Sequence, residues 1–149
     1  MPTNCLCTSV RQLARHITSL YETHLAPHGV SAPQFSLLQR LHLLGPIANL
    51  EFATEMGMDK STLSRGLKPL IAEGWVQTVV MPEGAVIDKR SFGLQLTESG
   101  TAKYWATYEA WSAAQAQMQE LLGKKLASRL LSTTLDVHQA INHRSAVTQ

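Results

Sequence analysis

The apolar positions at the start of the chain recur every three or four residues. From residue 5 to residue 25 they return to one face of a helix, which predicts a long amphipathic helix. Pro27, His28 and Gly29 follow at once and are expected to end it, because proline and glycine interrupt a helical pattern. The apolar residues of this face are Leu6, Val10, Leu13, Ile17, Leu20, Tyr21 and Leu25.

A second helix is predicted to begin after Ser31. Gln34 stands three residues later, so the serine hydroxyl can accept from an early helix N–H while the glutamine reaches back to the cap, a capping box. Apolar residues cover almost the whole circumference of this helix, and we therefore expect it to be buried between neighbours. They are Phe35, Leu37, Leu38, Leu41, Leu43 and Leu44.

The stretch from Asn49 to Trp75 predicts two short helices that meet at Gly57. This glycine can adopt the left-handed conformation of a sharp turn, and the small Ala53, four residues earlier, lets the helices approach closely. The spacing is typical of a helix-turn-helix. The apolar wedge that the helices share is predicted to contain Phe52, Met56, Leu63 and Leu67.

The second of these short helices carries a polar and basic face. Asp59 is placed to cap it, and no acidic residue occurs between Lys60 and Ala72. Lysine, arginine and hydroxyl side chains form hydrogen bonds with phosphates and base edges, so double-stranded DNA is the predicted partner. The candidate DNA-binding residues on this helix are Lys60, Ser61, Thr62, Ser64, Arg65 and Lys68.

Two strands are predicted to follow this helix. The run from Trp75 to Val80 is typical of a strand, residues 82–84 contain proline and glycine and predict a turn, and the alternation from Phe92 to Leu96 predicts a returning strand. Two strands directly after a recognition helix make a winged helix. Ile47 to Leu50 gives a weaker indication of a short strand that pairs with this wing.

The C-terminal third of the chain is predicted to be helical. Thr97 is placed to cap a long helix from Glu98, Gly123 interrupts it, and a last helix runs from Lys124 to about His143. With the first helix, these segments carry more apolar surface than a winged helix of this size can cover, which favours burial in a symmetric homodimer. The residues assigned to the subunit interface are Leu6, Val10, Leu126, Leu130 and Ile141.

The predicted fold class is therefore mainly α-helical, a winged helix-turn-helix with a two-stranded β-wing and N- and C-terminal dimerisation helices. Residues 1–30 and 98–149 are expected to form the dimerisation region, and residues 31–97 the DNA-binding region, around one shared core. A chain of 149 residues with 44% hydrophobic residues can form such a core. Its net charge of +2 neither requires nor excludes a nucleic-acid partner.

The order of these motifs resembles the MarR family of bacterial transcription regulators. The resemblance also rests on the sequence Asp88-Lys89-Arg90 and on LTESG from Leu96 to Gly100, and it covers nearly the whole chain. It implies a wing in which Arg90 enters the minor groove while Asp88 orients it, with Lys89 between them. It further implies a small-molecule effector, typically a small aromatic acid or a phenolic compound, bound between the dimerisation helices and the winged helix.

Candidate effector-binding residues lie on two helices. Arg11 and Arg15 are one turn apart on the first helix, with His16 adjacent, and could meet a ligand carboxylate. The alternative, that these cations are solvated or face phosphates, is slightly favoured. Tyr104 and Tyr108 belong to an aromatic-rich stretch of the long helix, where such residues are more often core or interface than ligand site.

Cys5 and Cys7 leave three interpretations open, namely inert residues, a thiol redox sensor, or half of a metal site. Positions two apart point to different faces of a helix, which is poor geometry for one disulfide or one chelate. A thiolate near a helix N-terminus, however, has a lowered pKa and is more reactive. The inert interpretation is favoured, and a redox-sensing regulator of the same fold stays an alternative.

The sequence contains no G-x-S-x-G elbow, P-loop, dinucleotide fingerprint or metal-ligand spacing of histidines. We accordingly expect no enzyme activity, no cofactor and no bound metal. No apolar run approaches the roughly 20 residues of a membrane-spanning helix, and the few cysteines fit a reducing compartment, so we expect a cytoplasmic protein without a membrane partner.

These features together predict a ligand-responsive transcription regulator, a repressor, that binds a pseudo-palindromic operator as a homodimer and is released by a small molecule. Besides the redox sensor, the alternatives are a winged helix used for protein interaction and a hydrolase that uses Cys5 or Cys7. The hydrolase rests on residue types alone.

Overall fold

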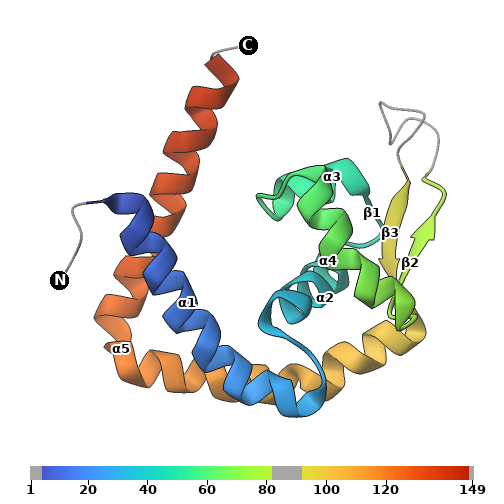
Figure 1. Ribbon diagram of the computed structural model, residues 1–149, viewed down its shortest axis with the longest axis horizontal. Helices are drawn as coiled ribbons and strands as arrows, with labels where there is room; N and C mark the ends of the chain where they lie inside the picture. Colours follow the sequence, from blue (N-terminus) through green and yellow to red (C-terminus); the bar gives the residue numbers. More distant parts are fainter. Residues whose placement is uncertain (1–4, 82–91, 148–149) are drawn as a thin grey trace.

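A computed structural model of the protein describes residues 5–81 and 92–147. The chain is mostly helical, with a small sheet to one side of the molecule (Figure 1). The elements in chain order are α1 (Leu6–Leu25), the 3-10 helix η1 (Ala26–His28), α2 (Ala32–Leu44), β1 (Ile47–Ala48), α3 (Asn49–Glu55), α4 (Lys60–Ala72), β2 (Val76–Val79), β3 (Gly93–Leu96) and α5 (Glu98–Val147). The predicted fold class is confirmed.

The ends of the first two helices follow their sequence signals. α1 passes into η1, and the chain then turns at Gly29, which has a left-handed φ of 70°. The hydroxyl of Ser31 accepts from the N–H of Gln34 at 3.2 Å, and the Gln34 side chain accepts from the N–H of Ser31 at 2.9 Å. Both halves of the predicted capping box are present.

α2 lies at the centre of the core, between α1, α4, α5 and β3. Phe35, Leu38 and Leu41 are buried. In the last turn of the helix Leu43 is 64% exposed and Leu44 is 37% exposed. The prediction that α2 is buried between its neighbours is confirmed, with the exception of these two leucines at its C-terminal end.

The sheet has the order β1-β3-β2 and is antiparallel throughout. Thr78 pairs with Leu94 on one side of β3, and Ile47 pairs with the same leucine on the other side. Leu94 is fully buried in consequence. The predicted wing strands and the weaker prediction of a short strand before α3 are both confirmed, with β2 shorter at each end than the run from Trp75 to Val80.

α5 links the sheet side of the molecule to the opposite side. In Figure 1 it begins beside β3, passes α2 and α1, against which it packs, and then turns so that its C-terminal part runs in a different direction from its first part. The turn lies at Gly123, whose φ of 70° and ψ of 155° are not helical, as the sequence predicts. Within the described ranges, no helix is long and apolar enough to cross a membrane.

A close junction joins the start of α5 to the turn between α4 and β2. The Thr97 hydroxyl donates to the carbonyl of Gly74 at 2.6 Å and accepts from the N–H of Gly100 at 2.9 Å. The N–H of Thr97 also donates to the carbonyl of Trp75 at 3.0 Å. A β-carbon at Gly100 would overlap the Trp75 carbonyl oxygen, so this approach requires glycine. One threonine thus caps α5 and ties it to the base of the wing.

We predict that Gly100→Ala destabilises the protein by about 2 to 3 kcal/mol, because the backbone of Trp75 must move to admit a methyl group. Ser99→Ala, at the exposed position one residue earlier, is the matched control and should stay within about 0.5 kcal/mol of the wild type. Urea unfolding followed by circular dichroism measures both. Equal stability of the two variants would show that the junction is not close-packed in solution.

Candidate nucleic-acid interface

α3 and α4 meet at a tight turn. Gly57 has a φ of 61°, and its N–H donates to the carbonyl of Thr54 at 3.0 Å. The N–H of Met58 donates to the carbonyl of Ala53 at 2.9 Å, and Ala53 is buried where the helices approach. The helix-turn-helix predicted from the Ala-Gly spacing is confirmed.

α4 is held by one face and presents the opposite one. Leu63, Leu67 and Leu70 are buried, and their spacing of three and four residues places the residues between them on the outer side of the helix. The outer residues are Lys60, Ser61, Ser64, Arg65 and Lys68, all exposed, and Thr62, which is half-buried. The structure thus brings the candidate set on α4 together on one helix surface.

Asp59 caps α4 and also binds the hydroxyls of its first turn. Its Oδ1 accepts from the N–H of Thr62 at 2.7 Å and from the hydroxyl of Ser61 at 2.8 Å. Its Oδ2 accepts from the hydroxyl of Thr62 at 3.0 Å. The same Thr62 hydroxyl accepts from Nη2 of Arg65 at 3.3 Å. Candidate DNA-binding residues are therefore connected to each other through the cap.

These hydrogen bonds hold Asp59 in its charged form. The N–H of Thr62, followed by the hydroxyls of Ser61 and Thr62, lowers the pKa of the Asp59 carboxyl from 3.8 to about 2. Because the folded pKa lies below the ordinary value, the stability that this cap contributes is present above pH 3.8 and is lost as the pH falls toward 2. At neutral pH the carboxylate can only accept hydrogen bonds.

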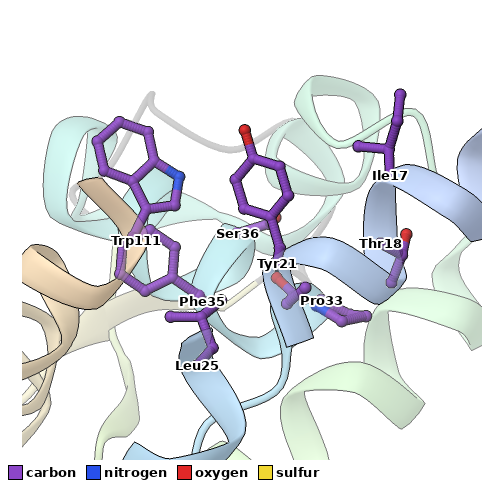
Figure 2. A pocket seen from close by; sticks show the side chains of 9 residues that line it. Ile17, Thr18, Tyr21, Leu25, Pro33, Phe35, Ser36 and Trp111 are labelled. Carbon is purple, nitrogen blue, oxygen red and sulfur yellow. The ribbon is translucent and has the colours of Figure 1, made fainter. Parts of the chain in front are cut away.

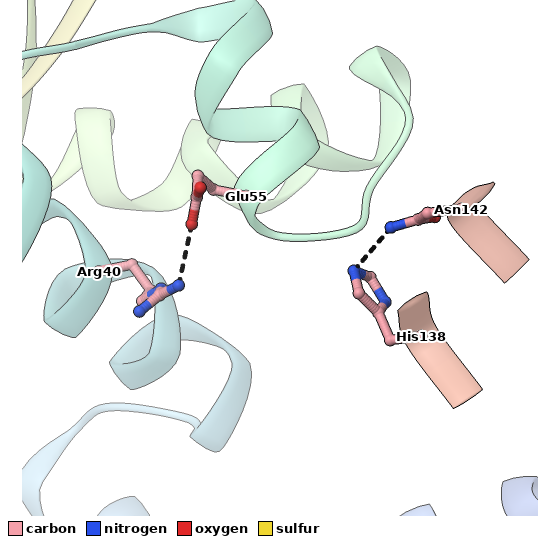
Figure 3. A network of polar contacts seen from close by, with 4 residues as sticks. All are labelled: Arg40, Glu55, His138 and Asn142. Atoms are coloured by element: carbon pink, nitrogen blue, oxygen red, sulfur yellow. Dashed lines mark hydrogen bonds and ion pairs between the residues drawn. The ribbon is translucent and has the colours of Figure 1, made fainter. Parts of the chain in front are cut away.

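The helix-turn-helix also contacts α2 and α5. Arg40 of α2 and Glu55 of α3 form an ion pair at 2.9 Å (Figure 3). Their side chains are 42% and 43% exposed, so solvent screens the pair and it adds little stability. His138 lies on the C-terminal part of α5, with its Cε1 3.8 Å from the position of a β-carbon at Gly57. Asn142 contacts the His138 ring at 2.9 Å. The far end of the chain thus reaches the turn between α3 and α4.

The predicted wing residues Asp88, Lys89 and Arg90 lie outside the described residues, as does the predicted turn at residues 82–84. Their assignment to DNA contact stays a prediction.

A pocket of about 300 Å³ lies between α1, α2 and α5 (Figure 2). The rings of Tyr21, Phe35 and Trp111 form its walls, and the hydroxyls of Thr18 and Ser36 also line it. The Tyr21 hydroxyl donates to Oε1 of Gln115, and burial raises the pKa of Tyr21. An apolar space with a few hydroxyl groups suits a small, mainly apolar ligand with polar substituents.

The structure separates the candidate ligand residues into two places. Tyr104 and Tyr108 belong to an aromatic row on α5 that ends at the pocket, where Trp111 stacks on Phe35 with ring centroids 5.7 Å apart. Arg11 and Arg15 line a neighbouring groove on α1 that shares Thr18 with the pocket. His16 is exposed on α1.

The sequence gives no sign that Ser36 or Thr18 lines a site, and it predicts Phe35 and Tyr21 only as apolar positions. Each belongs to the ordinary pattern of its own helix. Only the packing of three helices shows that these side chains share one cavity.

Cys5 is the N-terminal cap residue of α1, and Cys7 lies in the first turn; both are exposed. The side-chain hydrogen bond with Thr8 lowers the pKa of the Cys5 thiol. The redox assignment of the two cysteines stays a prediction. Within the described residues, no group of three or more histidine, cysteine, aspartate or glutamate side chains could hold a metal ion.

The sequence is similar to a protein-family model and to known regulators. The family model described as the MarR family matches residues 30–79, from the residue before Ser31 to the end of β2. An uncharacterized HTH-type transcriptional regulator of Bacillus subtilis, YwoH, is 31% identical over 99 residues, which cover 66% of this chain and 69% of that protein. The multiple antibiotic resistance protein MarR of Salmonella typhimurium is 30% identical over 83 residues, 56% of this chain and 55% of that protein.

The fold is also found among solved structures. The transcriptional regulator MosR of M. tuberculosis, in a crystal structure with DNA, matches with a TM-score of 0.79 and 26% sequence identity. The match covers 94% of this chain and 98% of that one, so it includes α1 and α5 as well as the winged helix.

Proposed function

The chain belongs to the MarR family of transcriptional regulators, and from this premise we propose that it binds a pseudo-palindromic operator as a homodimer and represses transcription there. The observation that carries the proposal is the outer face of α4. Its basic and hydroxyl side chains are exposed together, while the leucines on the opposite face fix the helix in the core. Because such a regulator must reach chromosomal DNA, the proposed location of the protein is the cytoplasm.

Within this proposal the residues of α4 have different roles. Ser61, Ser64 and Arg65 face the floor of the major groove, where their hydrogen bonds select the base sequence. Lys60 and Lys68 lie nearer the phosphates and contribute affinity for every sequence. The DNA in the MosR structure supports this use of the fold, since that protein matches this chain over both the helix-turn-helix and the long helices.

The dimer follows from apolar surface at the two ends of the chain. Leu6 is 73% exposed, and Leu126 is 51% exposed on the part of α5 beyond Gly123. Further exposed apolar residues on these segments are Val10, Leu13, Leu131, Leu135, Val137 and Ile141. We assign this surface to a second copy of the chain, which places two α4 helices in successive major grooves, roughly 34 Å apart.

The effector site we propose is the pocket of Figure 2. It lies between α1 and α5, which carry the proposed dimer surface, and α2, on which α4 packs. A small aromatic acid would place its ring against Phe35 and Trp111, with its carboxylate toward Arg15 in the adjoining groove. Such a ligand lowers DNA affinity only to the extent that it binds the geometry without DNA more tightly.

Substitutions on α4 test how DNA is read. Arg65→Ala should cost about 1 to 3 kcal/mol of operator affinity and relax the sequence preference, because a bidentate contact to a base is lost. Lys68→Ala should weaken all sequences alike and reduce the salt dependence. Fluorescence anisotropy with an operator selected from random duplexes and with a scrambled duplex, at two salt concentrations, measures both effects. Wild-type affinity and salt slope in both variants would mean that α4 does not read DNA. If the wild-type protein bound DNA with an affinity that did not fall with salt, a winged helix used for protein interaction would be favoured instead.

Charged substitutions on α5 test the dimer. Leu131→Glu combined with Leu135→Glu should give a monomer with strongly reduced operator affinity, because two carboxylates cannot be buried unpaired at the interface. The control is Leu43→Glu, an equally exposed leucine on α2 that lies outside the proposed surface, and it should remain dimeric. Sedimentation velocity measures the oligomeric state of each variant, and operator titration measures its affinity. A monomeric double variant with undiminished operator affinity would contradict the dimer model.

Filling the pocket tests the effector site. Ser36→Phe should leave operator binding intact but weaken its release by aromatic acids at least about tenfold, the effect of 1.4 kcal/mol of lost ligand affinity. Benzoate and 2-hydroxybenzoate are suitable probes. Ser112→Phe adds the same ring to an exposed position next to Trp111 that does not line the pocket, and should respond like the wild type. An unchanged response of Ser36→Phe would place the effector elsewhere.

A further inference from the structure

The first turn of α4 presents its hydroxyl groups to the outside in one fixed polarity. A hydroxyl group has one hydrogen to donate and two lone pairs with which to accept. The hydroxyls of Ser61 and Thr62 both meet a carboxylate oxygen of Asp59, at 2.8 Å and 3.0 Å. Because an ionised carboxylate cannot donate, both hydroxyl hydrogens point to Asp59. The Ser61 and Thr62 hydroxyls can therefore offer DNA only acceptors.

Arg65 is connected to the same network one turn further on. Its Nη2 donates to the hydroxyl of Thr62, which in turn donates to Asp59. This chain of hydrogen bonds uses one donor of the guanidinium and leaves the others available. Hydrogen bonds in series polarise and strengthen one another, so the orientation of Arg65 depends on the charge at Asp59.

From this geometry we propose that Asp59 is a positioning residue that sets the sequence preference of the recognition helix and contributes no favourable contact to DNA itself. The inference rests on the proposed DNA-binding function and deepens it. Through Ser61 the first turn accepts from the exocyclic amino group of cytosine or adenine, and through Arg65 it donates to guanine O6 and N7. The carboxylate itself opposes phosphates, so it lowers affinity for every sequence.

Asp59→Asn reverses the polarity of the Thr62 hydroxyl, leaves the Ser61 hydroxyl donating to Oδ1, and keeps the cap. Asparagine is as good an N-terminal cap as aspartate. The backbone N–H of Thr62 requires an oxygen opposite it, so the amide nitrogen must take the place of Oδ2 and donate to the Thr62 hydroxyl. That hydroxyl then accepts where it donated before. The hydrogen of the Thr62 hydroxyl no longer points to residue 59, and the hydrogen bond that this hydroxyl accepts from Arg65 is weakened.

Two further variants separate positioning from capping and from charge. Asp59→Ser keeps a capping oxygen for the N–H of Thr62 but has no second oxygen for the hydroxyls. Glu73→Gln removes the same charge from the other end of α4, where Glu73 is exposed at the C-terminal cap and forms no part of the network.

The wild-type protein first selects an operator from a library of random duplexes, and the dissociation constants of all variants are then measured for that operator and for a scrambled duplex at one salt concentration. We call the dissociation constant for the scrambled duplex divided by that for the operator the specificity ratio. We expect this ratio to fall roughly 5- to 100-fold in Asp59→Asn and Asp59→Ser, the range of one base contact. Binding of Asp59→Asn to the scrambled duplex should be equal or tighter. Glu73→Gln should keep the wild-type ratio.

A wild-type ratio in either Asp59 variant would overturn the proposal. If affinity for both duplexes fell equally, so that the ratio was kept, Asp59 would act only on the stability of the helix. Both results leave the proposed function intact. A wild-type protein that selects no sequence from the library would instead overturn the proposed function, and the role of Asp59 with it.

Discussion

The packing of α4 on α2 is the interaction on which the rest of the structure depends. Gly66 lies where the two helices approach, and a β-carbon there would come within 3.1 Å of Cδ1 of Leu37. The approach buries Leu63, Leu67 and Leu70 of α4 and thereby determines which side chains face outward. The N–H of Trp75 then donates to the carbonyl of Leu70 at 2.9 Å, so the wing and α5 are attached to the end of the same helix. The outer face of α4, which we propose reads DNA, is therefore positioned by the burial of apolar side chains on the opposite face of the same helix.

The parts of the fold that the sequence predicts are those whose cause is local. The capping box at Ser31, the left-handed turn at Gly57 and the bend at Gly123 each depend on a few neighbouring residues, and all are confirmed. The exposure of Leu43 depends on where the chain goes next, which its helical pattern does not contain. The pocket joins three helices, and the direction of the hydroxyls on α4 depends on distances of 2.8 to 3.0 Å, so neither is visible in a periodic pattern. The outer face of α4 was predictable because helical spacing alone separates it from the leucines.

α5 is the element through which distant parts of the molecule can influence one another. Its first turn is tied to the wing base by Thr97, its aromatic row ends at the pocket wall with Trp111, and beyond Gly123 it brings His138 to the turn between α3 and α4. Up to Gly123 the helix is continuous and stiff, so a shift at the pocket is carried to its first turn rather than absorbed near the pocket. The Gly123 bend is the described position on α5 with non-helical dihedrals, and it lies between the pocket and the proposed dimer surface. Physical continuity of this kind permits coupling, and the coupling itself requires that the bound geometries differ in free energy.

Sequence preference and effector response can then be separate properties of the protein. The hydrogen bonds from Asp59 to Ser61 and Thr62, and from Arg65 to Thr62, lie within one turn-and-helix segment and move with α4 as a unit. In the proposed mechanism, an effector between α1, α2 and α5 changes the distance between two such units in a dimer without altering the donors and acceptors on either. It thus weakens binding to two half-sites at a fixed spacing, while each half-site keeps its preference. By reciprocity, operator DNA lowers the affinity of the pocket for the effector by the same factor. In this proposal the effector acts on the spacing of the recognition helices, and the cap of α4 acts on the base sequence that each of them recognises.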